Sequence, residues 1–194
     1  MNILLIGGWL MTVNDGNAFW SLKGRLEAAG HTVRVRECDE EWWGQGARVK
    51  VVRDDVMWAD AVACYSYGMA SFKKILHDNA ADWKKVLQMV VIVAGVPDWW
   101  MGQCYGFLWR LEPFILSARC LQVTAIPSSA PIKNDLTKSV SIDSVATPWI
   151  ETSDTQYINI DIDNIVPHPR HTMIVNVPWV IDAIYTMLSS ISQS

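Results

Sequence analysis

The sequence predicts a single α/β domain, built on a doubly wound, mostly parallel sheet of about six strands flanked by helices. Two observations favour this fold class. Short continuous apolar runs, at residues 3–6 and 86–94 for example, are typical of strands that are buried on both faces. Segments with apolar residues at helical spacing lie between such runs, and strands that alternate with helices form parallel sheets. A chain of 194 residues is long enough for one sizeable core, so residues 1–194 are expected to form one unit.

The first third of the chain contains three predicted strands and the helices that join them. The first run ends at the pair Gly7-Gly8, and Gly30 is a natural end for the first helix. The second strand is expected from strict alternation, with arginines at every other position. In order, the expected elements are a strand at 3–6, a helix at 16–29, a strand at 32–36, a helix at 45–58 and a strand at 60–65.

The remaining chain continues the pattern after one interruption. Residues 96–119 are rich in aromatic residues, proline and glycine, and are expected to form a lid or cover insertion with a helix at 107–119. A polar stretch at 127–155 is predicted to be a long loop, which in a compact domain is functional or mobile. The expected regular elements are a helix at 69–81, strands at 86–94, 121–126 and 157–162, and a closing helix at 177–188.

Composition excludes several classes of function. The formal charge is −4 and lysines and arginines form no cluster beyond short pairs, which argues against nucleic-acid binding. The longest apolar run is too short to span a membrane. The four cysteines are widely spaced and form no CxxC pair, which is typical of reduced thiols. These features predict a cytoplasmic protein without a metal or other cofactor.

Eleven tryptophans are more than the core of one domain of this size is expected to bury. Several stand in adjacent pairs, of which Trp99 and Trp100 begin the aromatic insertion. Some tryptophans should therefore line a groove or an interface. We expect Trp99 and Trp100 to line a substrate pocket, and self-association into a homo-oligomer is compatible with the remaining aromatic surface.

The most informative stretch is the end of the third strand. An apolar run at residues 62–65 stops at Ser66, a glycine follows two residues later, and helical sequence begins at once. A serine on a sharp turn between a strand and a helix presents its hydroxyl where a nucleophile is placed. The helix that follows would direct the Tyr67 N–H toward a developing negative charge, and the Trp9 N–H, after the first strand, is the second expected donor.

A base for this serine is expected from the last loop of the fold. His171 lies between the last predicted strand and the closing helix, and so at the same carboxyl edge of the sheet as Ser66. Ligands of open α/β sheets bind at that edge. A hydroxyl with a histidine in reach and two backbone donors has the components of acyl transfer.

The segment CYSYG at residues 64–68 resembles the G-x-S-x-G nucleophile elbow of the α/β-hydrolase family, with Cys64 in place of the first glycine. The segments at 171–174 and 177–181 look like the histidine loop and closing helix of the lipases and esterases in that family. The order of elements is similar to a compact member without the leading antiparallel strands. The resemblance implies a serine hydrolase acting on a small-molecule ester, with Ser66 as nucleophile and His171 as base.

The third member of the expected triad is less clearly marked. The family places an acid just after the strand predicted at 121–126, and the first acidic residue there is Asp135. Asp135 is the first choice, and Asp98 and Asp143 are the alternatives. A dyad of serine and histidine held by a backbone carbonyl is a further option.

The same residues allow other interpretations. A flavodoxin-like module that binds a small anionic ligand at the Gly7-Gly8 turn and Ser66, without catalysis, is the principal alternative function. The motif G-x-G-x-x-G of dinucleotide-binding proteins is absent. His168 and His171 have the spacing of a metal pair but no evident third ligand. Cys64 is expected to be a buried and inert thiol within the third strand.

Overall fold

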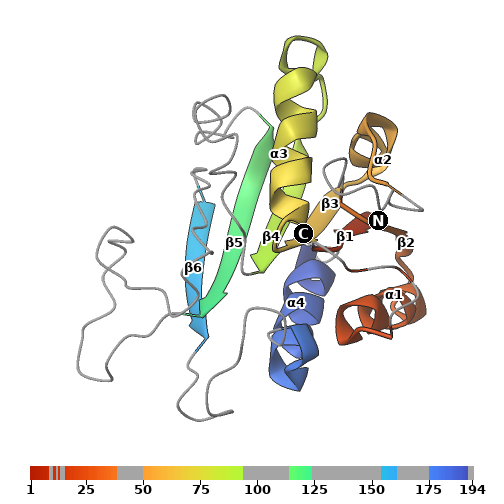
Figure 1. The fold of residues 1–194 in the computed structure, drawn as a ribbon, viewed down its shortest axis with the longest axis vertical. Coiled ribbons are helices and arrows are strands. Elements are labelled where there is room, and N and C mark those ends of the chain that lie inside the picture. The colour runs from red at the N-terminus through yellow and green to blue at the C-terminus, as the bar shows by residue number, and fades with distance from the viewer. Residues whose placement is uncertain are drawn as a thin grey trace, which may run out of the picture.

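Parallel strands alternate with helices over the first half of the chain, as Figure 1 shows. The computed structural model describes residues 1–8, 11, 13, 16–38, 50–93, 114–123, 154–160 and 175–191. Its elements are β1 (Asn2–Ile6), α1 (Ala18–Ala28), β2 (Thr32–Arg36), α2 (Arg53–Trp58), β3 (Ala61–Tyr65), α3 (Gly68–Asp78), the 3-10 turn η2 (Ala80–Asp82), β4 (Leu87–Val93), β5 (Ile115–Val123), β6 (Asp154–Ile160) and α4 (Pro178–Ser190).

The strands form a sheet in the order β2-β1-β3-β4-β5-β6, and each neighbouring pair is parallel. This arrangement confirms the predicted α/β class with a mostly parallel sheet flanked by helices. The register places Ile6 of β1 beside Cys64 of β3, and Tyr65 of β3 beside Val93 of β4. The ends of these three central strands therefore lie together at the carboxyl edge of the sheet.

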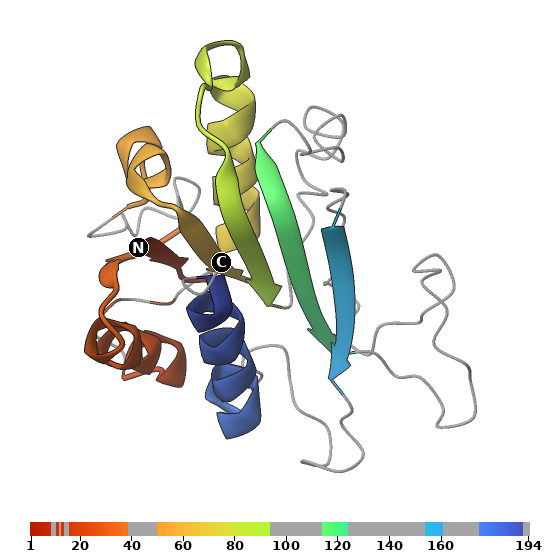
Figure 2. The ribbon, with the colours of Figure 1, turned by 180° about the vertical axis from the view of Figure 1, so that it is seen from behind.

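Helices cover both faces of the central strands (Figures 1 and 2). On one face Ile3 and Leu5 of β1 pack in a core cluster with α1 and α4, and on the other Leu4 and Ile6 pack with α2 and α3. All four side chains are fully buried. Successive residues of a strand point to opposite faces, which explains why β1 is an unbroken apolar run rather than an alternating one.

Two predicted boundaries are wrong. The helix expected at 45–58 begins only at Arg53, because Lys50 pairs with Glu37 in an isolated bridge and Val52 is still extended. Residues 45–49 lie outside the described residues. The helix is predicted from the helical spacing of Val49, Val52, Val56 and Met57, yet the backbone of Val52 is extended.

The second correction concerns the insertion at 96–119 and its helix at 107–119. Ile115 already pairs with Leu87, so the last five residues of both ranges belong to β5 and not to a helix or cover. Ile115 is buried in the cluster beneath α2 and α3. The core on this face extends β5 beyond the range predicted from the sequence; residues 94–113 lie outside the described part of the chain.

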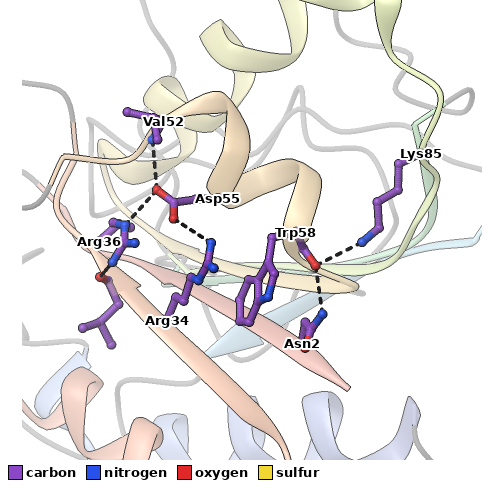
Figure 3. Close-up of polar contacts among 8 residues, drawn as sticks. Asn2, Arg34, Arg36, Val52, Asp55, Trp58 and Lys85 are labelled. Atoms are coloured by element: carbon purple, nitrogen blue, oxygen red, sulfur yellow. Dashed lines mark hydrogen bonds and ion pairs between the residues drawn. The ribbon is translucent and has the colours of Figure 1, made fainter.

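A buried carboxylate joins α2 to the edge strand β2 (Figure 3). Asp55 of α2 accepts hydrogen bonds from Arg36 Nε at 2.7 Å and from Arg34 Nη1 at 3.3 Å, and its side chain is only 3% exposed. The same carboxylate accepts the Val52 N–H at 3.3 Å, which caps the helix. The guanidinium of Arg34 also lies over the ring of Trp58, 4.1 Å from its centroid. Helix α2 is thus held by charge and hydrogen bonding as well as by its short apolar face.

A second polar contact fixes the start of the sheet. The Asn2 N–H donates to Asp60 Oδ2 at 2.8 Å, and Lys85 Nζ donates to Asp60 Oδ1 at 3.1 Å. Burial raises the pKa of Asp60, but these two donors outweigh burial and lower the pKa below its ordinary value. Asn2 and Lys85 also donate to the Trp58 carbonyl, as Figure 3 shows, so α2, β1 and the segment before β4 are tied together.

Replacing Asp55 should cost much more stability than replacing its exposed neighbour. Asp55→Ala leaves Arg34 and Arg36 without their shared acceptor and removes the cap, so we expect the free energy of unfolding to fall by about 2 kcal/mol. Asp54, whose side chain is 88% exposed, is the control, and Asp54→Ala should change it by about 0.5 kcal/mol or less. Urea unfolding measures both values. An equal loss of unfolding free energy in the two variants would show that the contacts of Asp55 do not stabilise the fold.

Candidate active site

The carboxyl edge of the sheet has a topological switch between β1 and β3. The chain leaves β1 toward α1 on one face of the sheet and leaves β3 toward α3 on the other, and the two strands are neighbours. Loops that diverge from adjacent strands leave a crevice at the sheet edge, which is where open α/β sheets bind ligands. The turn that contains Ser66 and the turn that contains Gly7 and Gly8 form the two sides of this switch.

Ser66 occupies a strained turn. Its φ is 51°, and it is the one non-glycine residue with positive φ in the described part of the chain. The Ser66 N–H donates to the Val93 carbonyl at 3.0 Å, and the Ser66 carbonyl accepts the Met69 N–H at 3.1 Å. Strand β4 and the first turn of α3 therefore hold both sides of the peptide backbone. A serine in this region of φ between a strand and a helix has the geometry of a nucleophile elbow.

Glycines make the close approach around Ser66 possible. A Cβ at Gly8 would lie 2.8 Å from the Ser66 Cβ and 2.9 Å from Tyr65 Cδ1. A Cβ at Gly68 would lie 2.6 Å from the Gly7 carbonyl oxygen and 2.7 Å from the Ile6 carbonyl oxygen. No side chain fits at either position without moving backbone or the serine itself. The glycine two residues after Ser66 is thus required by contact between the start of α3 and the end of β1.

Cys64 occupies the position of the first glycine of the motif. It lies in β3, is fully buried in the cluster beneath α2 and α3, and burial raises the pKa of its thiol. A protonated and enclosed thiol is a poor nucleophile. Cys38, two residues after β2, is also buried.

Tyr67 begins the helix that follows the serine. It is the N-cap of α3, with φ −65° and ψ −15°, and α3 extends for 11 residues from Gly68. The amides at a helix N-terminus have no partner within the helix and carry a partial positive charge. The Ser66 hydroxyl is therefore adjacent to a backbone terminus that stabilises negative charge.

Four hydrogen bonds hold the loop after β1, two within the loop and two to the end of β2. The Gly7 N–H donates to the Arg36 carbonyl at 2.9 Å, and the Gly8 carbonyl accepts the Met11 N–H at 3.1 Å. The Gly8 N–H donates to the thioether of Met11, with 3.3 Å between N and Sδ. Further along, Glu37 at the end of β2 is buried and accepts the Val13 N–H at 3.0 Å. These bonds fix the loop that contacts the Ser66 turn.

The structure brings together part of the predicted site. Ser66 and Tyr67 lie on one turn, and Gly8 contacts that turn from the end of β1. The other site residues predicted from the sequence lie outside the described residues: Trp9, Asp98, Trp99, Trp100, Asp135, Asp143, His168 and His171.

Two residues that support the turn were missed by sequence reasoning. Met11 is an apolar residue in a loop, and nothing in the pattern distinguishes its sulfur as an acceptor. Val93 acts through its carbonyl, which has no side-chain signature at all.

The described residues contain no cluster of metal-ligating side chains. In that part of the chain, no three histidine, cysteine, aspartate or glutamate side chains lie close enough to hold one metal ion. None of its helices combines the length and apolar character that a membrane crossing requires.

Comparisons with a set of protein-family models, with curated proteins and with solved structures gave no significant match to this chain.

An alanine at Gly68 should disrupt the turn, whereas an alanine in an open helix should stabilise the protein. Gly68→Ala places a methyl group against two backbone carbonyls, and we expect a loss of about 2 kcal/mol in the free energy of unfolding. Gly24 in α1 is the control, since a Cβ at this position would have no neighbour within 4 Å. Gly24→Ala should gain about 1 kcal/mol from helix propensity. Denaturant unfolding distinguishes the two, and a neutral Gly68→Ala would contradict the close approach.

Proposed function

We propose that the protein is a serine hydrolase that acts on carboxylic esters, with Ser66 as the nucleophile. The observation that carries this proposal is the strained backbone of Ser66 at a turn between β3 and α3, packed beneath Gly8 and against the start of a helix. Strain at a non-glycine residue persists only where surrounding structure enforces it, and such residues concentrate at active sites. The resemblance of residues 64–68 to the nucleophile elbow of the α/β-hydrolase family agrees with this geometry.

The proposed reaction has two steps. In the first, the Ser66 oxygen attacks the ester carbonyl carbon while His171 takes the hydroxyl proton, and the intermediate collapses with cleavage of the ester C–O bond and transfer of the proton to the departing alcohol. In the second, His171 activates a water molecule that attacks the acyl-enzyme and releases the carboxylic acid and free Ser66. Asp135 is the proposed partner of His171, with Asp98 and Asp143 as alternatives.

Backbone donors would stabilise the oxyanion in both steps. The Tyr67 N–H, at the start of α3, is the first proposed donor, and the Trp9 N–H, after the Gly7-Gly8 turn, is the second. Trp99 and Trp100 are the proposed walls of the acyl or alcohol pocket. We propose an ester rather than a peptide as the substrate, because the sequence contains no segment that indicates an extended binding cleft for a polypeptide. The buried free thiol of Cys64 agrees with a reducing, cytoplasmic setting.

The strand order favours one alternative enough to test it. The order β2-β1-β3-β4-β5 is also that of flavodoxin-like proteins, which bind ligands at the same switch without covalent chemistry. Such a module has no need for a reactive serine. Covalent labelling therefore distinguishes the two functions.

A small fluorophosphonate should label the protein at Ser66. The reagent must be compact, because Ser66 is only 5% exposed. Labelling should disappear in Ser66→Ala and fall by at least about a hundredfold in His171→Ala, which removes the base. The control is Ser71, a serine that is also buried but lies within α3. Ser71→Ala should be labelled as the wild type is. Intact-protein mass spectrometry follows the adduct; folded wild-type protein that stays unlabelled would refute the hydrolase.

Replacing Ser66 by glycine should abolish labelling and yet stabilise the fold. Glycine adopts positive φ without the cost of a Cβ, so Ser66→Gly should raise the free energy of unfolding by about 1 kcal/mol. The same change at Ser71, inside α3, should lower it by about 0.5 kcal/mol or more. Thermal unfolding measures both. A destabilised Ser66→Gly would show that the hydroxyl serves the fold and not catalysis.

A further inference from the structure

The loop beside Ser66 is closed by an unusual pair of reciprocal contacts. The Met11 N–H donates to the Gly8 carbonyl, and the Gly8 N–H donates to Met11 Sδ at 3.3 Å. Both residues are buried, and Met11 is only 8% exposed. A thioether is a weak acceptor, so a buried amide that relies on it is held less tightly than one bonded to a carbonyl.

Gly8 is also the residue of this loop in direct contact with the serine. A Cβ at Gly8 would approach the Ser66 Cβ to 2.8 Å, and a Cβ at Gly7 would approach the Met11 Cβ to 3.3 Å. Gly7 also lies against the Trp20 ring, where a Cβ would approach Trp20 Cη2 to 2.7 Å. Met11 and Trp20 therefore pack against Gly7, and Ser66 packs against Gly8. A shift of Gly8 toward Ser66 by a few tenths of an ångström must move the serine.

We propose that Met11 is a positioning residue for the nucleophile: its sulfur orients the Gly8 peptide, and Gly8 in turn fixes the position of Ser66. Met11 touches neither the substrate nor the reacting atoms. The effect of Met11 on the reactivity of Ser66 rests on the proposed function. The hydrogen bond from the Gly8 N–H to the Met11 sulfur does not depend on whether the protein is an enzyme.

The sequence offers a matched control for the thioether. Met89 in β4 is also 8% exposed and belongs to the same core cluster as Met11, but it pairs at the opposite part of the sheet with Ala61. Leucine conserves the volume and apolar character of methionine and removes the acceptor. Met11→Leu and Met89→Leu therefore change packing alike and differ in the bond to Gly8.

The first measurement is amide hydrogen exchange at Gly8, read by NMR. We expect exchange at Gly8 to become about threefold to tenfold faster in Met11→Leu and to stay unchanged in Met89→Leu, as the loss of one hydrogen bond requires. Met11→Gln restores an acceptor of similar reach and should recover most of the protection. Equal Gly8 exchange in Met11→Leu and wild type would overturn the proposal whether or not the protein is an enzyme.

The second measurement is the rate constant of fluorophosphonate labelling at Ser66. It should fall about tenfold in Met11→Leu, recover in part in Met11→Gln and remain at the wild-type value in Met89→Leu. If both leucine variants lose equal stability and label at the wild-type rate, Met11 is a packing residue and the proposal fails. If wild-type protein is not labelled at all, the hydrolase proposal fails, and the exchange experiment alone still decides whether sulfur holds the Gly8 peptide.

Discussion

The contact between the start of α3 and the end of β1 is the constraint from which the geometry of the sheet edge follows. Gly68 lies so close to the carbonyl oxygens of Ile6 and Gly7 that no side chain fits between them. The chain passes from β3 to α3 through only two residues, Ser66 and Tyr67, and Ser66 has positive φ. The serine lies against Gly8, just as Gly68 lies against the end of β1. Close contact with this edge therefore accounts for the absence of a side chain at positions 8 and 68.

The helices on the two faces of the sheet are held by different polar contacts. On the face of α1 and α4, apolar packing is supplemented by Arg25, which bonds Asp182 at 2.7 Å and lies over the ring of Tyr185. On the face of α2 and α3, the short helix α2 is held to β2 through Asp55. The helices α1 and α3 follow the adjacent strands β1 and β3 and pack on opposite faces of the sheet, so the Ser66 turn lies where the two layers meet.

How much the sequence could predict depends on whether a signal is carried by side chains. The unbroken apolar runs of β1, β3 and β4 identified the sheet, and a serine between a strand and a helix identified the turn. The start of β5 at Ile115 was missed because an aromatic-rich stretch conceals it, and the start of α2 because Val52 has helical spacing but extended backbone. The contacts of Gly8 and Met11 depend on a carbonyl, an amide and a sulfur, which leave no periodic pattern.

The identity of the residue at position 66 bears on function more than its conformation does. In the described part of the chain, the other two positive φ values belong to Gly16 and Gly30. Glycine adopts positive φ with the least steric strain. At the Ser66 turn, glycine already occupies positions 8 and 68, so the sequence does not lack glycine there. A serine with positive φ carries a steric cost that a glycine does not, and such strained residues are found mostly at functional sites. The Ser66 side chain, rather than the backbone of its turn alone, is therefore the feature on which the proposed function depends.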